Sequence, residues 1–115
     1  MSAARFRSNR LVSAAGGVTI CSMPKVELAG FIIVPASDLE AVQAELPTHI
    51  QLTRAEPGCI SFSVEQSPSD PHRFDVAEVF ANREAFEMHQ TRVKSSDWGK
   101  ITGNVERHYL VRGVS

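Results

Sequence analysis

The run from Val26 to Val34 constrains the fold more than any other part of the chain, because it is apolar on both sides. It is rich in β-branched and aromatic residues and is bounded by Pro24 and Pro35, which is typical of a strand. Its two alternating sets are Leu28, Ile32 and Val34 on one side and Ala29, Phe31 and Ile33 on the other. Both faces of such a strand must be covered, and helices can cover only one of them.

The chain has 115 residues, of which 43% are hydrophobic, so it can build one core but not two independent ones. We therefore expect one domain over residues 26–113. Residues 1–25 form a compositional outlier that is rich in Ser, Ala and Arg and poor in acids. This N-terminal extension is expected to be a disordered segment or the product of an upstream start codon; if it is ordered, Gly17-Val18-Thr19-Ile20 could lie against a neighbouring subunit as an added strand.

The formal net charge of −1 gives no general attraction to nucleic acid or anionic lipid, and no run of 18 apolar residues could span a membrane. Cys21 and Cys59 lie far apart and outside any CxxC pattern, which favours a reducing cytoplasm over a disulfide scaffold. We expect a cytoplasmic protein whose partners are a small molecule and a second copy of itself.

The residues after Pro35 predict a helix. Ser37 and Glu40 have the spacing of a capping box. In this motif the serine hydroxyl accepts the backbone amide of Glu40, and the Glu40 carboxylate accepts the backbone amide of Ser37. An apolar stripe at helical spacing follows, formed by Leu39, Val42, Leu46, Ile50 and Thr53. Pro47 interrupts this stripe, so we expect a kink or short break near Leu46, and an end to the helix by Pro57 and Gly58.

Three further elements follow the turn at Pro57. Cys59 to Gln66 alternates as a half-buried strand, and Arg73 to Phe80 forms the next strand after a loop of turn-forming residues. Asn82 can cap a second helix. An irregular polar stretch closed by Trp98 and Gly99 comes next. The pattern from Val105 to Val111 predicts the last strand.

The expected order is β-α-β-β-α-β, the ferredoxin-like α+β arrangement, in which a four-stranded antiparallel sheet carries two helices on one face. The other face of the sheet still needs cover. Because the first strand is apolar on both sides, we expect a homodimer formed through this sheet face.

The order of features between Arg54 and His89 resembles the antibiotic biosynthesis monooxygenase (ABM) family, over roughly residues 26–113. The matching features are Arg54-Ala55-Glu56-Pro57-Gly58-Cys59-Ile60-Ser61-Phe62, Asp70-Pro71-His72-Arg73-Phe74, Glu78-Val79-Phe80, and Glu84-Ala85-Phe86 with His89. The resemblance implies a small dimeric α/β barrel, in which two sheets close with their helices outside. It leaves the reaction open, because such proteins include cofactor-free quinol oxygenases, haem degraders, isomerases and members without known activity.

Glu78 is the main candidate for chemistry. Alternation places it on one strand face with Phe74, Val76 and Phe80, where a lone carboxylate is unfavourable unless a partner accompanies it. His89 shares a helix side with Ala85 and Phe86 and can reach toward that strand, where Glu78 would fix its tautomer and strengthen it as a base. The alternatives are a structural Glu78 that binds amides or an arginine, and a core histidine.

His49, on the first helix between two stripe positions, could line the same cavity from the other side as a third catalytic candidate. His49, His89 and Glu78 together have the composition of a non-haem iron site. They lie on separate elements without a local ligand spacing, so we expect no metal and no other cofactor.

The candidate substrate-binding residues are two arginines and a set of aromatics. Arg54 and Arg73 flank the second hairpin and could hold an anionic substrate group at the pocket mouth, although salt bridges to Glu56 or Asp75 compete with that role. The aromatics, which could equally fill the core, are Phe31, Phe62, Phe74, Phe80, Phe86 and Trp98.

The resemblance favours a cofactor-independent monooxygenase acting with O2 on a small aromatic or quinol-like substrate. The haem-degrading branch fits less well, because its strand tryptophan falls at Phe80 and its downstream histidine ligand has no counterpart. A small-molecule isomerase and a non-catalytic ligand-binding dimer of the same fold remain the alternatives.

Overall fold

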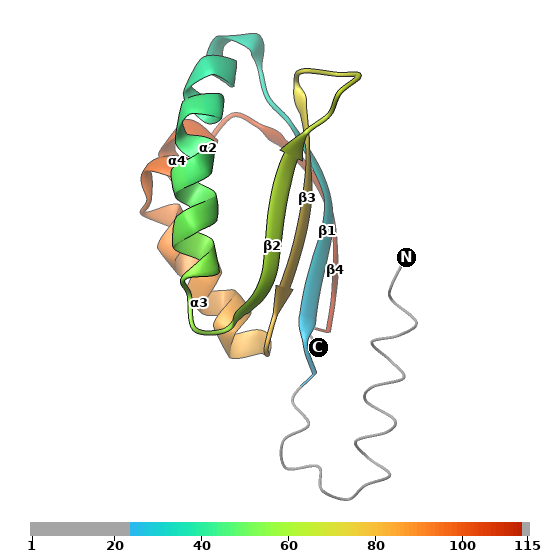
Figure 1. The fold of residues 1–115 in the computed structure, drawn as a ribbon, viewed down its shortest axis with the longest axis vertical. Coiled ribbons are helices and arrows are strands. Elements are labelled where there is room, and N and C mark those ends of the chain that lie inside the picture. Colours follow the sequence, from blue (N-terminus) through green and yellow to red (C-terminus); the bar gives the residue numbers. More distant parts are fainter. Residues whose placement is uncertain (1–23, 114–115) are drawn as a thin grey trace, which may run out of the picture.

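The computed structural model describes residues 24–113, and these form one layer of strands and one layer of helices (Figure 1). The predicted N-terminal extension lies almost wholly outside the described residues. The elements in chain order are β1 (Val26–Ile33), the 3₁₀ helix η2 (Ala36–Asp38), α2 (Leu39–Arg54), β2 (Cys59–Gln66), β3 (Arg73–Phe80), α3 (Arg83–Lys94), α4 (Asp97–Ile101) and β4 (Glu106–Arg112). No helix among these residues is long and apolar enough to cross a membrane.

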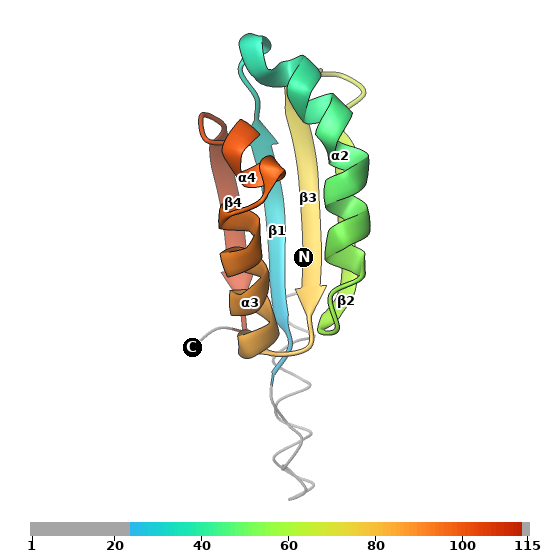
Figure 2. The same cartoon turned by 90° about the vertical axis from the view of Figure 1, so that its left-hand side faces the viewer.

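The four strands form an antiparallel sheet in the order β2-β3-β1-β4. All helices of the described residues lie on one face of this sheet, with α2 in front of β2 and β3 and α3 in front of β1 and β4 (Figure 2). The predicted ferredoxin-like arrangement is therefore confirmed. The strand that is apolar on both sides, β1, occupies an interior position between β3 and β4, as its composition requires.

Helix α2 begins differently from the prediction. Pro35 adopts an extended conformation and its carbonyl accepts the amide of Asp38 at 2.9 Å, so a 3₁₀ turn closes before the α-helix begins. Ser37 lies inside that turn, and the N-terminus of α2 has no side-chain cap. The predicted capping box was wrong because its serine is part of a helical turn and does not precede one.

The break predicted at Pro47 does not occur, and α2 runs from Leu39 to Arg54 without interruption. Pro47 is exposed on the outer side of the helix. The opposite side buries Val42, His49 and Thr53. Packing on both sides of the proline along this buried face therefore holds the helix together across the missing backbone hydrogen bond.

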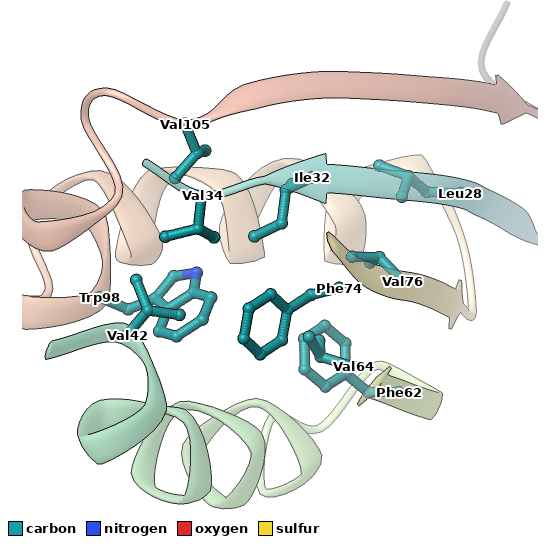
Figure 3. Close-up of a cluster of buried hydrophobic side chains, with 10 residues drawn as sticks. All are labelled: Leu28, Ile32, Val34, Val42, Phe62, Val64, Phe74, Val76, Trp98 and Val105. Carbon is teal, nitrogen blue, oxygen red and sulfur yellow. The ribbon is translucent and has the colours of Figure 1, made fainter. Parts of the chain in front are cut away.

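The core lies between the sheet and the helices and is supplied mainly by alternate strand residues (Figure 3). Phe74 and Val76 of β3 are buried together with Glu78 and Phe80, which confirms the predicted face of this strand. The whole buried cluster consists of Leu28, Ile32, Val34, Val42, Phe62, Val64, Phe74, Val76, Trp98 and Val105.

The segment after α3 was predicted as irregular but contains the short helix α4. Ser96 caps it by accepting the amide of Gly99 at 3.1 Å, and Trp98 is thereby turned into the core. A Cβ at Gly99 would lie 2.1 Å from the carbonyl oxygen of Val93, so glycine permits the close packing of α4 on α3. The predicted cap at Asn82 is confirmed, with its side chain accepting the amide of Ala85 at 2.9 Å.

Candidate active site

A cavity of about 320 Å³ lies between the helices and the sheet. Its volume is at the lower end of the range for sites that enclose small organic molecules, about 300–1,000 Å³. Its apolar walls are formed by Leu28, Ile32, Phe62, Val64, Val76, Val93, Trp98 and Val105. Its polar lining consists of His49, Glu78, His89, Gln90, Lys94, Thr102, Arg107 and Tyr109.

Glu78 lies in this cavity with 6% of its surface exposed, and its Oε1 has no hydrogen-bond partner. Period-two alternation in β3 puts it on the helix-facing side, opposite Leu28 of β1 and Phe62 of β2. Burial, and to a lesser degree the charge of Glu56, raises the pKa of Glu78 to about 7. The carboxyl can therefore both hold and release a proton near neutral pH.

His89 of α3 approaches Glu78, as the sequence indicated. Its Nε2 is 4.0 Å from Oε1 of Glu78, which is too long for a hydrogen bond but within one bridging hydroxyl or water. Its Nδ1 lies 3.1 Å from Oε1 of Glu56. Glu56, and not Glu78 as predicted, is therefore the carboxylate that orients the imidazole and selects its tautomer.

Glu56 is held in turn by Arg92, whose Nε donates to its Oε2 at 2.5 Å and whose Nη2 donates to Thr53 Oγ1 at 2.9 Å. With Nδ1 of His89 donating to Glu56, Nε2 carries the lone pair that faces the cavity. Burial lowers the pKa of His89, and the hydrogen bond and charge of Glu56 partly offset that effect. Sequence reasoning missed Glu56 and Arg92, although Arg92 follows His89 by three residues and so lies on the same helix side.

His49 lines the same cavity from α2, as expected, but its environment does not suit a base. Its ring stacks on Trp98 with centroids 4.4 Å apart, and its buried Nδ1 has no partner. Burial, followed by the charges of His89 and Arg92, lowers its pKa to about 3. The ring is therefore neutral near pH 7 and can only exchange hydrogen bonds with a ligand. Among residues 24–113, no three His, Cys, Asp or Glu side chains are grouped so that they could hold a metal ion.

The six candidate aromatics do not act as one set. Phe62 and Trp98 line the cavity, whereas Phe74 and Phe80 are completely buried in the core, and Phe86 packs on Phe80. Phe31 lies elsewhere, because its position in β1 points to the sheet face without helices, where it stacks on His108 at 4.6 Å. The expected aromatic cavity thus has two of its six members.

The two candidate arginines are not at the cavity mouth. Arg54 donates from Nε and Nη2 to the carbonyl oxygen of Phe62 at 3.0 and 2.8 Å. Arg73 pairs with Asp75 at 2.9 Å and covers the ring of Phe31. The competing salt bridge to Asp75 is therefore the observed one, while Arg54 fastens the end of α2 to β2.

Strand β4 contributes two cavity residues that sequence reasoning did not single out, Arg107 and Tyr109. Burial, with the charge of Glu78, raises the pKa of Tyr109 to about 12, so its hydroxyl stays protonated. The available signal was alternation: Arg107 and Tyr109 lie across from Ile32 and Gly30 on the face that β1 turns toward the helices.

Comparison with known proteins identifies the family. Residues 26–100 match the model of the antibiotic biosynthesis monooxygenase family. A putative antibiotic biosynthesis monooxygenase from Nitrosomonas europaea is 22% identical with a TM-score of 0.63, and the match covers 78% of this chain and 97% of that one. Protein PA3566 from Pseudomonas aeruginosa is 26% identical with a TM-score of 0.60, and that match covers 80% of this chain and 96% of the other.

A curated relative, the uncharacterized protein sll1783 of Synechocystis, is 36% identical over 64 residues. That match covers 56% of this chain and 44% of the relative, so the chain spans under half the length of that protein. The structural neighbour from Nitrosomonas shares the fold over almost its whole length at low identity. The family model, which matches most of the described residues, shows that the chain belongs to the antibiotic biosynthesis monooxygenase family.

Proposed function

We infer that the chain is a monooxygenase that uses neither metal nor flavin and oxidises a small aromatic hydroxyl compound or quinol with O2. The observation that carries this proposal is the unpartnered Oε1 of Glu78, 4.0 Å from Nε2 of His89 at the wall of a largely apolar cavity. Two acceptors facing one small space form a site for the hydroxyl group of a ligand. Family membership supports the reaction class.

The first chemical step is removal of the substrate's hydroxyl proton. A hydroxyl oxygen at about 2.7 Å from both Oε1 of Glu78 and Nε2 of His89 fits between them, because twice that length exceeds their separation of 4.0 Å. Burial lowers the pKa of His89 and raises that of Glu78, so Glu78 is the stronger base of the pair. Glu56 and Arg92 keep the lone pair of His89 directed at the same oxygen.

The raised pKa of Glu78 makes this transfer feasible. A phenol has a pKa of about 10, so transfer to a carboxylate with a pKa of about 7 is uphill by about 4 kcal/mol. Transfer to a carboxylate with the ordinary value of 4.5 would be uphill by about 7 kcal/mol. The burial of Glu78 therefore removes a large part of the barrier that an exposed carboxylate would face.

The later steps need only the substrate and O2. The substrate anion passes one electron to O2, and the radical and superoxide combine to a peroxide anion on the ring, which takes the proton held by Glu78 and becomes a hydroperoxide. The hydroperoxide then loses water, formed from its terminal hydroxyl and the hydrogen on the same ring carbon, and leaves a quinone. One phenol and one O2 give one quinone and one water, so no outside reductant is required. The apolar walls keep bulk water away from the radical pair.

An isomerase acting on a hydroxylated carbonyl compound is the second candidate. It is favoured by the pKa of about 7 at Glu78, because a proton shuttle needs one group that gives a proton while its neighbour accepts one. His89 supplies that neighbour at 4.0 Å. Such a reaction consumes no O2, which separates it from the first candidate.

The proposed working form is a cytoplasmic homodimer in which two copies pack through the sheet face that carries no helices. This face presents Leu110, which is 48% exposed, beside the half-buried Ala29 and Phe31. Apolar side chains of this size on one face are usually covered by a partner.

Turnover of a panel of quinols and naphthols tests the reaction. It is followed as oxygen uptake in air and as loss of substrate without O2. We expect uptake and quinone formation in the wild type, a loss of about 100-fold or more in Glu78→Gln, and a clear loss in His89→Gln. Glu84→Gln, at an exposed glutamate on α3 that does not line the cavity, is the matched control. Uptake that persists in both site variants would contradict the assignment. Conversion without O2 would indicate the isomerase, and binding without turnover a ligand-binding protein.

A further inference from the structure

Two cationic side chains, Lys94 of α3 and Arg107 of β4, line the same cavity as Glu78 and His89. We propose that the ligand of this cavity carries a carboxylate at the end away from its hydroxyl, and that Lys94 and Arg107 bind this carboxylate. The inference rests on the proposed role of Glu78 and His89 in receiving the hydroxyl end. It adds a substrate class, hydroxylated aromatic acids, to that function.

Neither cation is neutralised by a carboxylate in residues 24–113. The side chain of Lys94 makes no hydrogen bond or ion pair there, and Nη2 of Arg107 donates to the carbonyl oxygen and hydroxyl of Thr102 at 3.0 and 3.3 Å. Both residues line the cavity and are also exposed, so they lie where the cavity opens to solvent. They can therefore receive an anion from solution without first breaking an ion pair.

The cavity is cationic although the chain is not. The whole chain has a formal net charge of −1. In the cavity, the low pKa of His49 and the high pKa of Tyr109 leave both groups neutral, and Glu78, the one acid in the lining, is itself partly protonated near pH 7. Lys94 and Arg107 thus set the sign of the local potential, which favours an anionic ligand.

The cations and the acceptors occupy opposite ends of the cavity. Lys94 follows His89 by five residues, which is about 7.5 Å along α3. On the sheet, Glu78 lies across from Leu28 and Arg107 across from Ile32, a separation of about 13 Å along β1. In Figure 2, α3 ends and β4 begins on the same side of the molecule, beside α4. A rigid bicyclic acid with its hydroxyl at the far end fits this spacing.

Each cation also has a simpler role that must be separated from ligand binding. Lys94 lies in the last turn of α3, where a positive charge favours the helix, and Arg107 ties β4 to the end of α4 through Thr102. These roles predict small losses of stability on mutation. They do not predict that the cavity distinguishes an acid from its neutral ester.

Fluorescence titration with 6-hydroxy-2-naphthoic acid and with its methyl ester makes that distinction, because the two probes differ in charge but hardly in shape. We expect the acid to bind the wild type about tenfold or more tightly than the ester, and the preference to shrink as salt is added. Lys94→Met and Arg107→Gln should each weaken binding of the acid several-fold and leave the ester unchanged. The double variant should bind both probes equally.

Two control variants keep the result interpretable. Lys100→Met removes an exposed cation of α4 that does not line the cavity, and should leave both affinities as in the wild type. Arg107→Lys keeps the charge and should retain most of the preference even if the bond to Thr102 is lost. Equal wild-type affinities for acid and ester, or a preference that survives in the folded double variant, would overturn the inference.

The titration needs no turnover, so its outcome is separable from that of the proposed function. A charge preference without oxygen uptake would leave the anion site standing and remove the monooxygenase. Oxygen uptake that is equally fast with 2-naphthol and with the acid, together with equal affinities, would leave the monooxygenase and remove the anion site.

Discussion

Glu78 couples the proposed chemistry to the stability of the fold. Its pKa rises from 4.5 to about 7 on folding, so the folded protein holds a proton that the unfolded chain releases. Its contribution to stability is therefore complete below pH 4.5 and is lost as the pH rises through about 7. The shift corresponds to about 3 kcal/mol.

Replacing Glu78 by Gln should remove this dependence. Between about pH 4.5 and pH 8, the free energy of unfolding of the wild type should fall by about 3 kcal/mol relative to Glu78→Gln, as measured by urea denaturation at both pH values. Glu84→Gln, at an exposed position of α3, should follow the wild type. Parallel pH profiles for the wild type and Glu78→Gln would contradict the raised pKa.

The contribution of His49 to stability has the opposite pH dependence. Burial lowers its pKa from 6.5 to about 3, so its contribution is complete above pH 6.5 and is lost as the pH falls through about 3. In His49→Phe, which keeps an aromatic ring beside Trp98, the loss of unfolding free energy between about pH 7 and pH 4 should be smaller by about 3 kcal/mol. The measurement is urea denaturation with His108→Gln as control. An unchanged loss in His49→Phe would show that the ring is not held neutral by burial.

At the scale of single elements, Gly30 governs how β4 joins the sheet. A Cβ at this position would lie 1.9 Å from the carbonyl oxygen of His108 in β4, a contact that only movement of the backbone could relieve. Because Arg107 and Tyr109 reach the cavity from β4, the glycine also positions the cavity wall.

Gly30→Ala should therefore separate β4 from β1 and reduce the free energy of unfolding by about 2–3 kcal/mol. Amide hydrogen exchange should speed up in β4 before it does in β3. Gly103→Ala is the matched control, since its Cβ would lie 3.6 Å from the nearest atom, the carbonyl oxygen of Lys100, which is an ordinary contact. Wild-type protection of β4 in Gly30→Ala would contradict this role.

The elements that sequence reasoning located are those whose signal is local. Alternation in β3 placed Glu78 on the buried face, and Asn82 was identified as a cap from its side chain alone. Helix α4 was not predicted, because five residues are too few to show an apolar repeat at helical spacing. The one signal available was Ser96, a residue type that often caps a helix, just before Trp98.

The partners inside the site were harder to predict, because they depend on distances between elements. Sequence periodicity indicated that Glu78 and His89 share one space, and they do. It could not show that the turn after α2 brings Glu56 within 3.1 Å of His89, ahead of Glu78. Competition between two carboxylates for one imidazole is settled by tertiary geometry, which periodicity does not contain.

At the scale of the whole molecule, the sheet presents two unlike faces. Among residues 24–113, helices cover the face that carries Leu28 and Ile32, whereas no helix lies over the face that carries Phe31 and Leu110 (Figure 1). Leu110 of β4 lies across from Ala29 on this second face, and 48% of its surface is exposed. The free energy of covering such side chains favours association of two copies through this face.

A charge at Leu110 should therefore dissociate the proposed dimer. We expect sedimentation equilibrium at micromolar concentration to give twice the chain mass for the wild type and the mass of one chain for Leu110→Glu, because an unpaired carboxylate inside an apolar interface is strongly unfavourable. Met88→Glu introduces the same charge at a side chain that is 64% exposed on α3, on the helix side of the molecule, and should leave the dimer intact. A monomeric wild type would contradict the sheet-face dimer. Dissociation by both variants alike would indicate that the contact does not depend on this face.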